Sequence, residues 1–221
     1  MIKCCIFDLD GTLLDTIGTI TYFVNYALEN YGFSKTTEEE CKYFAGDGAR
    51  TLIRRALDSK GAALSDGEFE EILEFYRNAY DENPLYLTEV FSGIKQLLSD
   101  LKCAGVKLAV LSNKPDSAVR PIVEGFFPST FDLVRGARDG FALKPSAASA
   151  LKIADELSVC PSECAFIGDT GVDIETGKNL GAKITFGVLW GFRPKKELSD
   201  FGADRIVSEP KEILEEILLN D

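Results

Sequence analysis

The sequence of 221 residues contains no histidine. This absence excludes a Ser-His-Asp triad, a Cys-His nucleophile pair, phosphohistidine chemistry and metal sites built on imidazole. Any acid–base catalysis must therefore use Asp, Glu, Lys, Tyr or Cys side chains. A reaction carried by aspartates alone is compatible with this restriction.

Long hydrophobic runs and paired cysteines are also missing. No apolar run approaches the roughly 18 residues that a membrane span needs. The N-terminus shows no basic region followed by a long apolar stretch, which a signal peptide would have. We therefore expect a cytoplasmic protein with no membrane partner. The six cysteines form no Cys-x-x-Cys pair, so we interpret them as reduced thiols and expect neither a zinc site nor a disulfide framework.

Basic residues are scarce relative to acidic ones. The chain has 24 Lys and Arg against 36 Asp and Glu, which gives a formal net charge of −12. Such a charge argues against nucleic acid as a partner, because its binding requires a positive field. If the substrate is a phosphate, the site must supply positive charge locally, through a metal ion and a lysine. The 45% hydrophobic content allows a substantial core, in one domain or one domain with an insertion.

Two carboxylates follow the first apolar segment. Residues 2–7 read as a strand buried on both faces, and Asp8 and Asp10 come directly after it. Residues i and i+2 of a strand point to the same face, and ligands bind at strand C-termini in open α/β sheets. One carboxylate could attack while the other handles a proton. Taken alone, Asp-x-Asp is equally compatible with an acidic turn.

The rest of the chain predicts an α/β core interrupted by helices. Residues 16–83 show helical periodicity and two capping-box patterns, at Thr37 and Ser65, with no strand candidate. After Pro84, helices alternate with strands at 106–111, 131–134, 165–167, 184–188 and 205–207, a pattern typical of βαβ units and a parallel sheet. We predict a helix that starts at 94 and ends at Gly105, and further helices at 115–126, 145–157, 172–180 and from 210 onward. The predicted fold is a Rossmann-like doubly wound core (1–15 and 84–221) with an inserted helical domain (16–83).

Three further polar motifs stand near predicted strand ends. Ser112-Asn113 ends the 106–111 strand, Lys144-Pro145 opens a helix, and Gly168-Asp169 is followed by Asp173 after the 165–167 strand. Each has a plain structural reading: turn formers, a solvated lysine, and acidic residues at a helix N-terminus. Their joint occurrence in this order is much harder to attribute to coincidence.

The string Asp8-Leu9-Asp10-Gly11-Thr12 resembles the first signature motif of the haloacid dehalogenase-like superfamily, whose phosphatase members begin Asp-x-Asp-Gly-Thr. The other three motifs resemble the second, third and fourth motifs of that superfamily, and together they cover the predicted core almost end to end. The resemblance implies that Asp8 is a nucleophile that forms an aspartyl-phosphate. It implies that Asp10 protonates the leaving oxygen and then deprotonates the attacking water.

The resemblance also assigns the remaining site residues. Ser112 would hydrogen-bond the transferring phosphoryl group, and Lys144 would neutralise the nucleophile and the phosphate. The cofactor would be Mg²⁺, a hard ion that prefers oxygen ligands. Its ligands would be Asp8, the backbone carbonyl of Asp10, Asp169 and Asp173, the last directly or through water. Thr12 and Asn113, which belong to the first two motif strings, are candidate substrate-binding residues.

The inserted helical domain resembles the cap that varies substrate choice in this superfamily. Its segment Gly46-Asp47-Gly48-Ala49-Arg50 resembles the cap loop of phosphoglycolate phosphatases, as does Trp190-Gly191-Phe192-Arg193 in the core. A Gly-rich loop at a helix N-terminus can bind an anion. We therefore expect Gly46, Gly48 or Arg50 to contact the non-phosphate end of the substrate. A plain helix start with a solvated arginine is an equally good interpretation.

The sequence thus predicts a Mg²⁺-dependent phosphatase for a small phosphorylated metabolite, with phosphoglycolate as one candidate. One alternative is a β-phosphoglucomutase-like phosphosugar mutase, and another is a pyrophosphate or nucleotide phosphatase. Mutases of this kind usually have Val at the position of Thr12 and a cap His or Lys near the site, so Thr12 and the absence of histidine favour hydrolysis. A binding module that keeps the motifs is a weaker alternative. We expect a monomer or small homo-oligomer.

Overall fold

The structure, a computed structural model, describes residues 1–138 and 140–219. It divides into two compact units, one of Met1–Asp15 with Val90–Asp221 and one of Thr16–Glu89. The sequence placed the second boundary earlier, at Pro84. The segment 84–89 belongs to the helical unit because the Thr19 hydroxyl donates to the Tyr86 carbonyl oxygen at 2.5 Å and lies 2.8 Å from the Thr88 hydroxyl.

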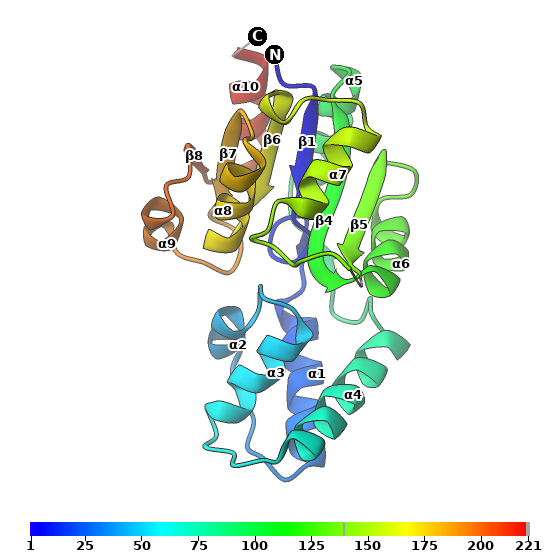
Figure 1. Ribbon diagram of the computed structural model, residues 1–221, viewed down its shortest axis with the longest axis vertical. Helices are drawn as coiled ribbons and strands as arrows, with labels where there is room; N and C mark the ends of the chain where they lie inside the picture. The colour runs from blue at the N-terminus through cyan, green and yellow to red at the C-terminus, as the bar shows by residue number, and fades with distance from the viewer. Residues whose placement is uncertain (139, 220–221) are drawn as a thin grey trace. The chain divides into compact units, whose positions relative to one another are not determined.

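A six-stranded parallel sheet forms the centre of the first unit (Figure 1). Its strands stand in the order β5-β4-β1-β6-β7-β8, and every neighbouring pair is parallel. This arrangement confirms the predicted Rossmann-like α/β core. The strands are β1 (Cys4–Phe7), β4 (Lys107–Pro115), β5 (Leu133–Ala137), β6 (Cys164–Gly168), β7 (Ile184–Val188) and β8 (Arg205–Val207).

The strand order makes β1 the point where the chain reverses direction across the sheet. Phe7 at the end of β1 pairs in register with Val110 of β4 on one side and with Ile167 of β6 on the other. The residues that follow these three positions therefore emerge together at one edge of the sheet. Ligands in open α/β folds bind at such a switch point, at the carboxyl ends of the strands.

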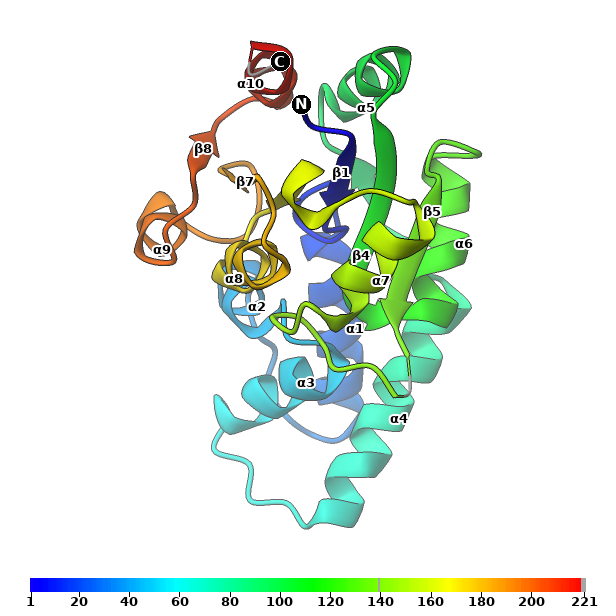
Figure 2. The same cartoon turned by 45° about the horizontal axis from the view of Figure 1, so that its top comes forward.

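Helices cover both faces of the sheet. Figures 1 and 2 show α7 (Ala148–Glu156) and α8 (Gly171–Leu180) on one face, and α5 (Ile94–Cys103) and α10 (Pro210–Leu219) on the other. Helix α6 (Asp116–Phe126) packs against β4 and β5, and the short α9 (Lys195–Asp200) against α8 and β8. The apolar face of α7, with Ala150, Ile153 and Ala154, packs against residues of β1, β4 and β6.

Several predicted element boundaries differ from the observed ones. Helix α7 begins at Ala148, whereas Pro145 was expected, because the preceding backbone of Lys144 is bonded to Asn113. Strand β5 lies at Leu133–Ala137 and not at 131–134. Helix α9, the 3₁₀ turn Pro161–Glu163 and the small sheet of β2 (Leu14–Asp15) with β3 (Glu89–Val90) were not predicted.

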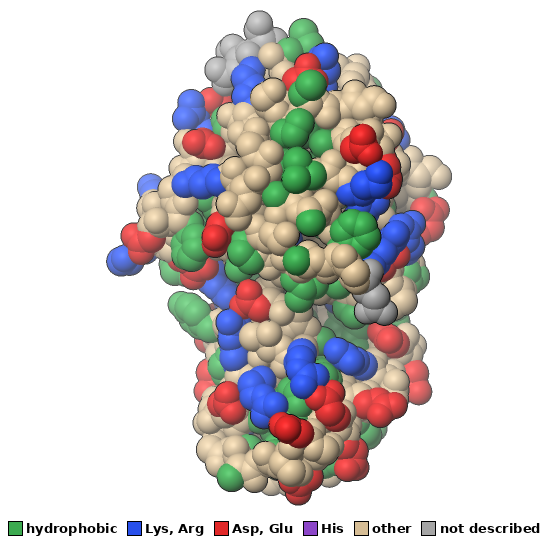
Figure 3. Space-filling view, in the orientation of Figure 1, with side chains coloured by type: hydrophobic (Ala, Val, Ile, Leu, Met, Phe, Trp, Pro, Cys, Tyr) green, Lys and Arg blue, Asp and Glu red, His purple; other side chains and the backbone are tan. Residues whose placement is uncertain are grey.

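The second unit is helical, as predicted. It contains α1 (Ile17–Asn30), α2 (Glu38–Phe44), α3 (Ala49–Asp58) and α4 (Asp66–Glu82). Both expected capping boxes are present, at Thr37 with Glu40 and at Ser65 with Glu68. Figure 3 shows Lys and Arg side chains over α3 with acidic side chains beside them. Within the described residues, no helix of either unit is both long and apolar enough to cross a bilayer.

Candidate active site

The site begins with Asp8, the first residue after β1. Its backbone N–H donates to the Ile167 carbonyl of β6 at 2.9 Å, which extends the sheet pairing by one residue and fixes the Cα position. The side chain is buried, and its Oδ1 accepts a hydrogen bond from Lys144 Nζ at 2.6 Å. Among the described residues, no hydrogen bond to Asp8 Oδ2 occurs. One carboxylate oxygen is therefore held while the other remains available.

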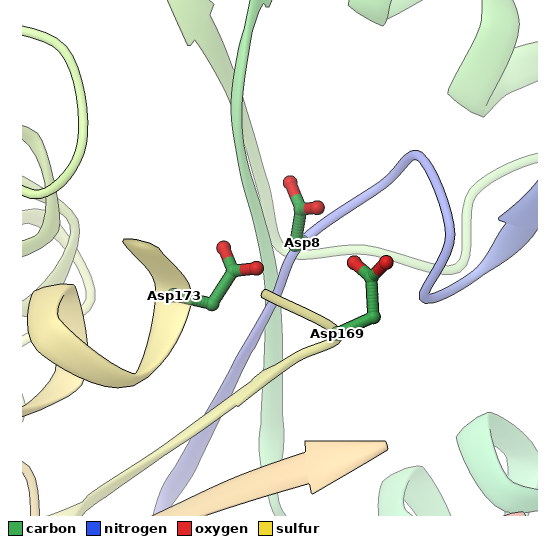
Figure 4. Close-up of side chains that lie close together, drawn as sticks. All are labelled: Asp8, Asp169 and Asp173. Atoms are coloured by element: carbon green, nitrogen blue, oxygen red, sulfur yellow. The ribbon is translucent and has the colours of Figure 1, made fainter. Parts of the chain in front are cut away.

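Asp169 and Asp173 reach the same place from β6 and from the first turn of α8 (Figure 4). Carboxylate oxygens of Asp8, Asp169 and Asp173 all lie within 4.8 Å of one another. Asp173 caps its own helix, because its Oδ2 accepts from the Thr170 N–H at 3.1 Å and from the Thr170 hydroxyl at 2.7 Å. Gly168 allows this turn, since a Cβ there would collide with the Asp173 side chain.

Lys144 supplies the positive charge in this cluster. Its Nζ donates to Asp8 Oδ1 and to Asp173 Oδ1, both at 2.6 Å, and its side chain is only 4% exposed. The Asn113 side chain holds the Lys144 backbone from both sides: Asn113 Oδ1 accepts from the Lys144 N–H at 2.8 Å, and Asn113 Nδ2 donates to the Lys144 carbonyl at 3.2 Å. Two motifs that are separate in the sequence thus position one another.

Burial of several carboxylates around one ammonium group shifts the pKa values. Burial raises the pKa of Asp8 to about 7, Asp173 adds to the rise, and Lys144 opposes it. Burial also raises the pKa of Asp169 well above its usual range, reinforced by the charges of Asp173 and Asp8. For Lys144, burial alone would lower the pKa, but Asp173 and Asp8 outweigh it and raise the pKa above its ordinary value. The cluster is short of positive charge.

The donor set fits a divalent hard cation. Asp8, Asp169 and Asp173 offer only oxygen ligands, which Mg²⁺ prefers. With Asp10, the site has four carboxylates. The lysines bonded to them are Lys144 and Lys114, which leaves a formal surplus of two negative charges. One divalent cation would cancel that surplus and would let Asp8 and Asp169 ionise despite their burial. The residues present therefore fit the ion that the sequence predicted.

Adding Mg²⁺ to protein treated with EDTA should raise its unfolding temperature. A ligand that binds only the folded state stabilises it by about 2.7 kcal/mol at a concentration 100 times its Kd. Asp169→Asn should remove most of this shift, because it takes away a buried ligand oxygen and its charge. Thermal unfolding followed by circular dichroism measures the effect, with NaCl of equal ionic strength as the control. An equal shift in wild type and variant would contradict the assignment of Asp169.

The structure places the other predicted core residues at the same edge, with contacts that the sequence did not reveal. Ser112 is buried near the end of β4, and its hydroxyl accepts from the Lys114 N–H at 3.2 Å. The hydroxyl of Thr12, a predicted substrate ligand, donates to Asp169 Oδ1 at 3.2 Å. Asn113, also predicted to bind substrate, holds Lys144 as described above. The geometry gives Thr12 and Asn113 positioning contacts inside the cluster, and their substrate contacts stay a prediction.

Two contributions were missed by sequence reasoning. Lys114 Nζ donates to Asp10 Oδ1 at 2.8 Å, and the sequence indicated no role for this lysine. The loop after β7 orients the Asp169 carboxylate: the Phe192 N–H donates to Asp169 Oδ2 at 2.7 Å, and the Trp190 indole N–H donates to the Thr12 carbonyl at 3.0 Å. Gly191 lies so close to Asp169 and Gly11 that a Cβ there would collide with both. The only available signal was the resemblance of residues 190–193 to phosphoglycolate phosphatases.

The predicted substrate loop belongs to the helical unit. Gly46 and Gly48 have positive φ values of 111° and 84°, and Gly48 is the N-cap residue of α3. Arg50 forms a two-point ion pair with Glu70 of α4, with Nη1 and Oε2 2.9 Å apart and a second bond from Nη2 to Oε1. Its guanidinium is therefore already neutralised within the unit. A substrate contact by this loop stays a prediction.

Comparison with known proteins is consistent with this geometry. Residues 5–186 match the family model described as haloacid dehalogenase-like hydrolase. The chain is 32% identical to phosphoglycolate phosphatase of Aquifex aeolicus, over 92% of each chain. It is 30% identical to N-acetylmuramic acid 6-phosphate phosphatase of Pseudomonas aeruginosa, over 97% of this chain and 94% of the other.

A solved structure supports the same family assignment. A Lactobacillus delbrueckii subsp. bulgaricus protein, provisionally named phosphoglycolate phosphatase, superposes with a TM-score of 0.92 at 34% identity, covering 97% of this chain and 98% of the other. The family match spans both ends of the site cluster, from Asp8 to Asp173. The chain belongs to the haloacid dehalogenase-like hydrolase family, in its phosphoglycolate phosphatase-like branch, and is a phosphatase.

Proposed function

We propose that this phosphatase hydrolyses a small phosphomonoester through an aspartyl-phosphate on Asp8, with phosphoglycolate as the first candidate substrate. The observation that carries the proposal is the state of the Asp8 carboxylate. One of its oxygens is fixed by Lys144 and the other accepts no hydrogen bond from a described residue. A carboxylate held in this way is oriented for attack and partly shielded from the negative charge of its target.

In the first step, an Asp8 oxygen attacks phosphorus as the bond from phosphorus to the ester oxygen breaks. The leaving alkoxide takes a proton from the Asp10 carboxyl. Asp10 follows Asp8 by two residues and lies in the turn that leaves β1, where the Gly11 N–H donates to the Leu14 carbonyl at 2.8 Å. Such acid–base assistance contributes about 10²–10⁴-fold to the rate.

In the second step, water attacks the phosphorus of the aspartyl-phosphate. Asp10 takes a proton from that water, and the bond from phosphorus to Asp8 breaks, which releases phosphate and restores the carboxylate. Bound Mg²⁺ would neutralise phosphoryl oxygens, and Asp8, Asp169, Asp173 and the Asp10 carbonyl are the groups proposed to hold it. Phosphoryl transfer depends mainly on positioning and charge neutralisation, which we expect Lys144 and Ser112 to supply.

The helical unit 16–89 is proposed to act as the cap that selects the substrate. Its loop at Gly46–Gly48 is held by Arg55, which pairs with Asp47 at 2.7 Å and donates to the Phe44 carbonyl at 3.1 Å. This leaves the loop backbone in a defined shape from which its amides could recognise the non-phosphate end of a ligand. One relative is named for a small substrate, phosphoglycolate, and another for a bulky one, N-acetylmuramic acid 6-phosphate. The test must therefore include both compounds.

Phosphate release from a panel of esters tests the proposal. The panel is 2-phosphoglycolate, N-acetylmuramic acid 6-phosphate, glucose 1-phosphate, a nucleoside monophosphate, pyrophosphate and p-nitrophenyl phosphate, each with Mg²⁺ and with EDTA. We expect Mg²⁺-dependent release with the highest kcat/KM for 2-phosphoglycolate. Isomerisation of glucose 1-phosphate with little free phosphate would instead establish a mutase. Release that is equal in EDTA would contradict the metal assignment.

A further inference from the structure

Lys114 and Asp10 form a second lysine–aspartate pair beside the nucleophile. Lys114 Nζ lies 2.8 Å from Asp10 Oδ1, and the two side chains are only 11% and 19% exposed. The pair joins residues 104 positions apart. It forms because β4 and β1 are neighbours in register, which brings the end of β4 beside the turn that follows β1.

The backbones on both sides of this pair are fixed. On the Asp10 side, the Leu9 carbonyl accepts from the N–H groups of Leu13 and Leu14 at 3.0 and 3.1 Å, which closes a tight turn. On the Lys114 side, the N–H donates to the Ser112 hydroxyl, and the next residue, Pro115, still pairs with Ala137 of β5. Two rigid backbones therefore present the two side chains to each other.

The Asp10 carboxylate has no other hydrogen-bond donor among the described residues. Without Lys114, no described hydrogen bond would restrict the rotation of this carboxylate, and the ammonium group of Lys144 is already bonded to Asp8 and Asp173. The two lysines thus serve different carboxylates. Lys144 holds the nucleophile, and Lys114 holds the residue that exchanges protons with the leaving group and with water.

We propose that Lys114 is a positioning residue that holds the Asp10 carboxylate in the orientation from which it serves the leaving-group oxygen. This inference rests on the proposed function, in which Asp10 is the acid–base group. A displacement of about 1 Å of a reacting group can reduce a rate by about 10²-fold. The loss of Lys114 should therefore reduce the rate for substrates whose leaving group needs a proton. It should have little effect on the rate for substrates whose leaving group does not.

The experiment compares kcat/KM for phenyl phosphate and p-nitrophenyl phosphate, which differ little in size but greatly in the basicity of the leaving oxygen. The quantity kcat/KM reports transfer to Asp8 without the later hydrolysis step. For Lys114→Met we expect a loss of about 10–100-fold on phenyl phosphate and a loss several-fold smaller on p-nitrophenyl phosphate. Lys114→Arg should recover much of the lost rate on phenyl phosphate. Lys107→Met, at the opposite and exposed end of β4, is the matched control. It should leave kcat/KM unchanged for both phenyl phosphate and p-nitrophenyl phosphate.

A double-mutant cycle with Asp10→Asn separates the inference from the proposed function. If Lys114 acts through Asp10, the double variant should be no slower on phenyl phosphate than Asp10→Asn alone. A Lys114→Met loss that is equal for both substrates, or that adds fully to the Asp10→Asn loss, would overturn the positioning role while leaving the proposed function intact. If Asp10→Asn instead lowered kcat/KM by the same factor for both substrates, Asp10 would not be the acid–base group. The inference about Lys114 would then fail as well.

Discussion

Asp8→Asn is expected to abolish phosphate release and to give a protein that is more stable than wild type when no metal is bound. An amide cannot attack phosphorus, so kcat should fall by about 10⁴-fold or more, as is typical when a covalent nucleophile is removed. The gain in stability follows from electrostatics. Asp8 is a buried acid close to Asp173 and Asp169, and its ionised form is disfavoured in the folded state.

The sign of the pH dependence follows from the raised pKa of Asp8. Because this pKa is about 7 in the folded protein and 3.8 ordinarily, the folded state binds the proton more tightly than the unfolded chain does. Ionised Asp8 therefore costs stability, and this cost grows as the pH rises from about 3.8 to about 7. Asp8→Asn removes this cost, so the free energy of unfolding in EDTA should rise at pH 8 by on the order of a few kcal/mol, and little at pH 4.

Urea unfolding in EDTA at pH 4 and pH 8 measures this difference. Asp58→Asn, which neutralises an exposed acid on α3, is the matched control and should leave the pH dependence unchanged. Excess Mg²⁺ should reduce or reverse the advantage of Asp8→Asn, because the wild-type carboxylate then has a cation to bind. A variant that is less stable than wild type at pH 8 in EDTA would show that the contact with Lys144 outweighs the repulsion.

The aspartates of the site could be predicted because they depend on local rules. Asp8 follows a fully apolar strand, and Asp169 and Asp173 stand at the junction of a strand and a helix, so the carboxyl ends of parallel strands bring them together. Lys144 has no such signal, because it lies in a connecting segment before α7. Only the resemblance to a known family selected it.

Pairings between distant side chains could not be predicted. The contact between Lys114 and Asp10 requires β4 to continue to Pro115, whereas the apolar pattern ends at Leu111. The two bonds from Asn113 to the Lys144 backbone depend on a loop conformation that no periodicity encodes. The same holds for the boundary at Glu89, which follows from side-chain bonds of Thr19 and not from the Pro84 break.

Lys144→Met is expected to have the largest effect on stability and a severe effect on activity. Lys144 is the cation bonded to both Asp8 and Asp173, so its loss leaves buried carboxylates without a compensating charge. Breaking a buried ion pair from one side costs about 3–5 kcal/mol. Phosphate release should fall by about 10³-fold, comparable with the loss of a group that stabilises transition-state charge.

The double variant Asp8→Asn with Lys144→Met makes this prediction specific. If uncompensated charge causes the instability, Asp8→Asn should raise the unfolding temperature more in the Lys144→Met protein than in wild type. Loss of packing around the lysine side chain would give the same increase in both proteins. Lys152→Met, which breaks an exposed pair with Asp155 on α7, should change the unfolding temperature little. A Lys144→Met protein as stable as this control would mean that the buried carboxylates are protonated in the folded state and need no ammonium partner.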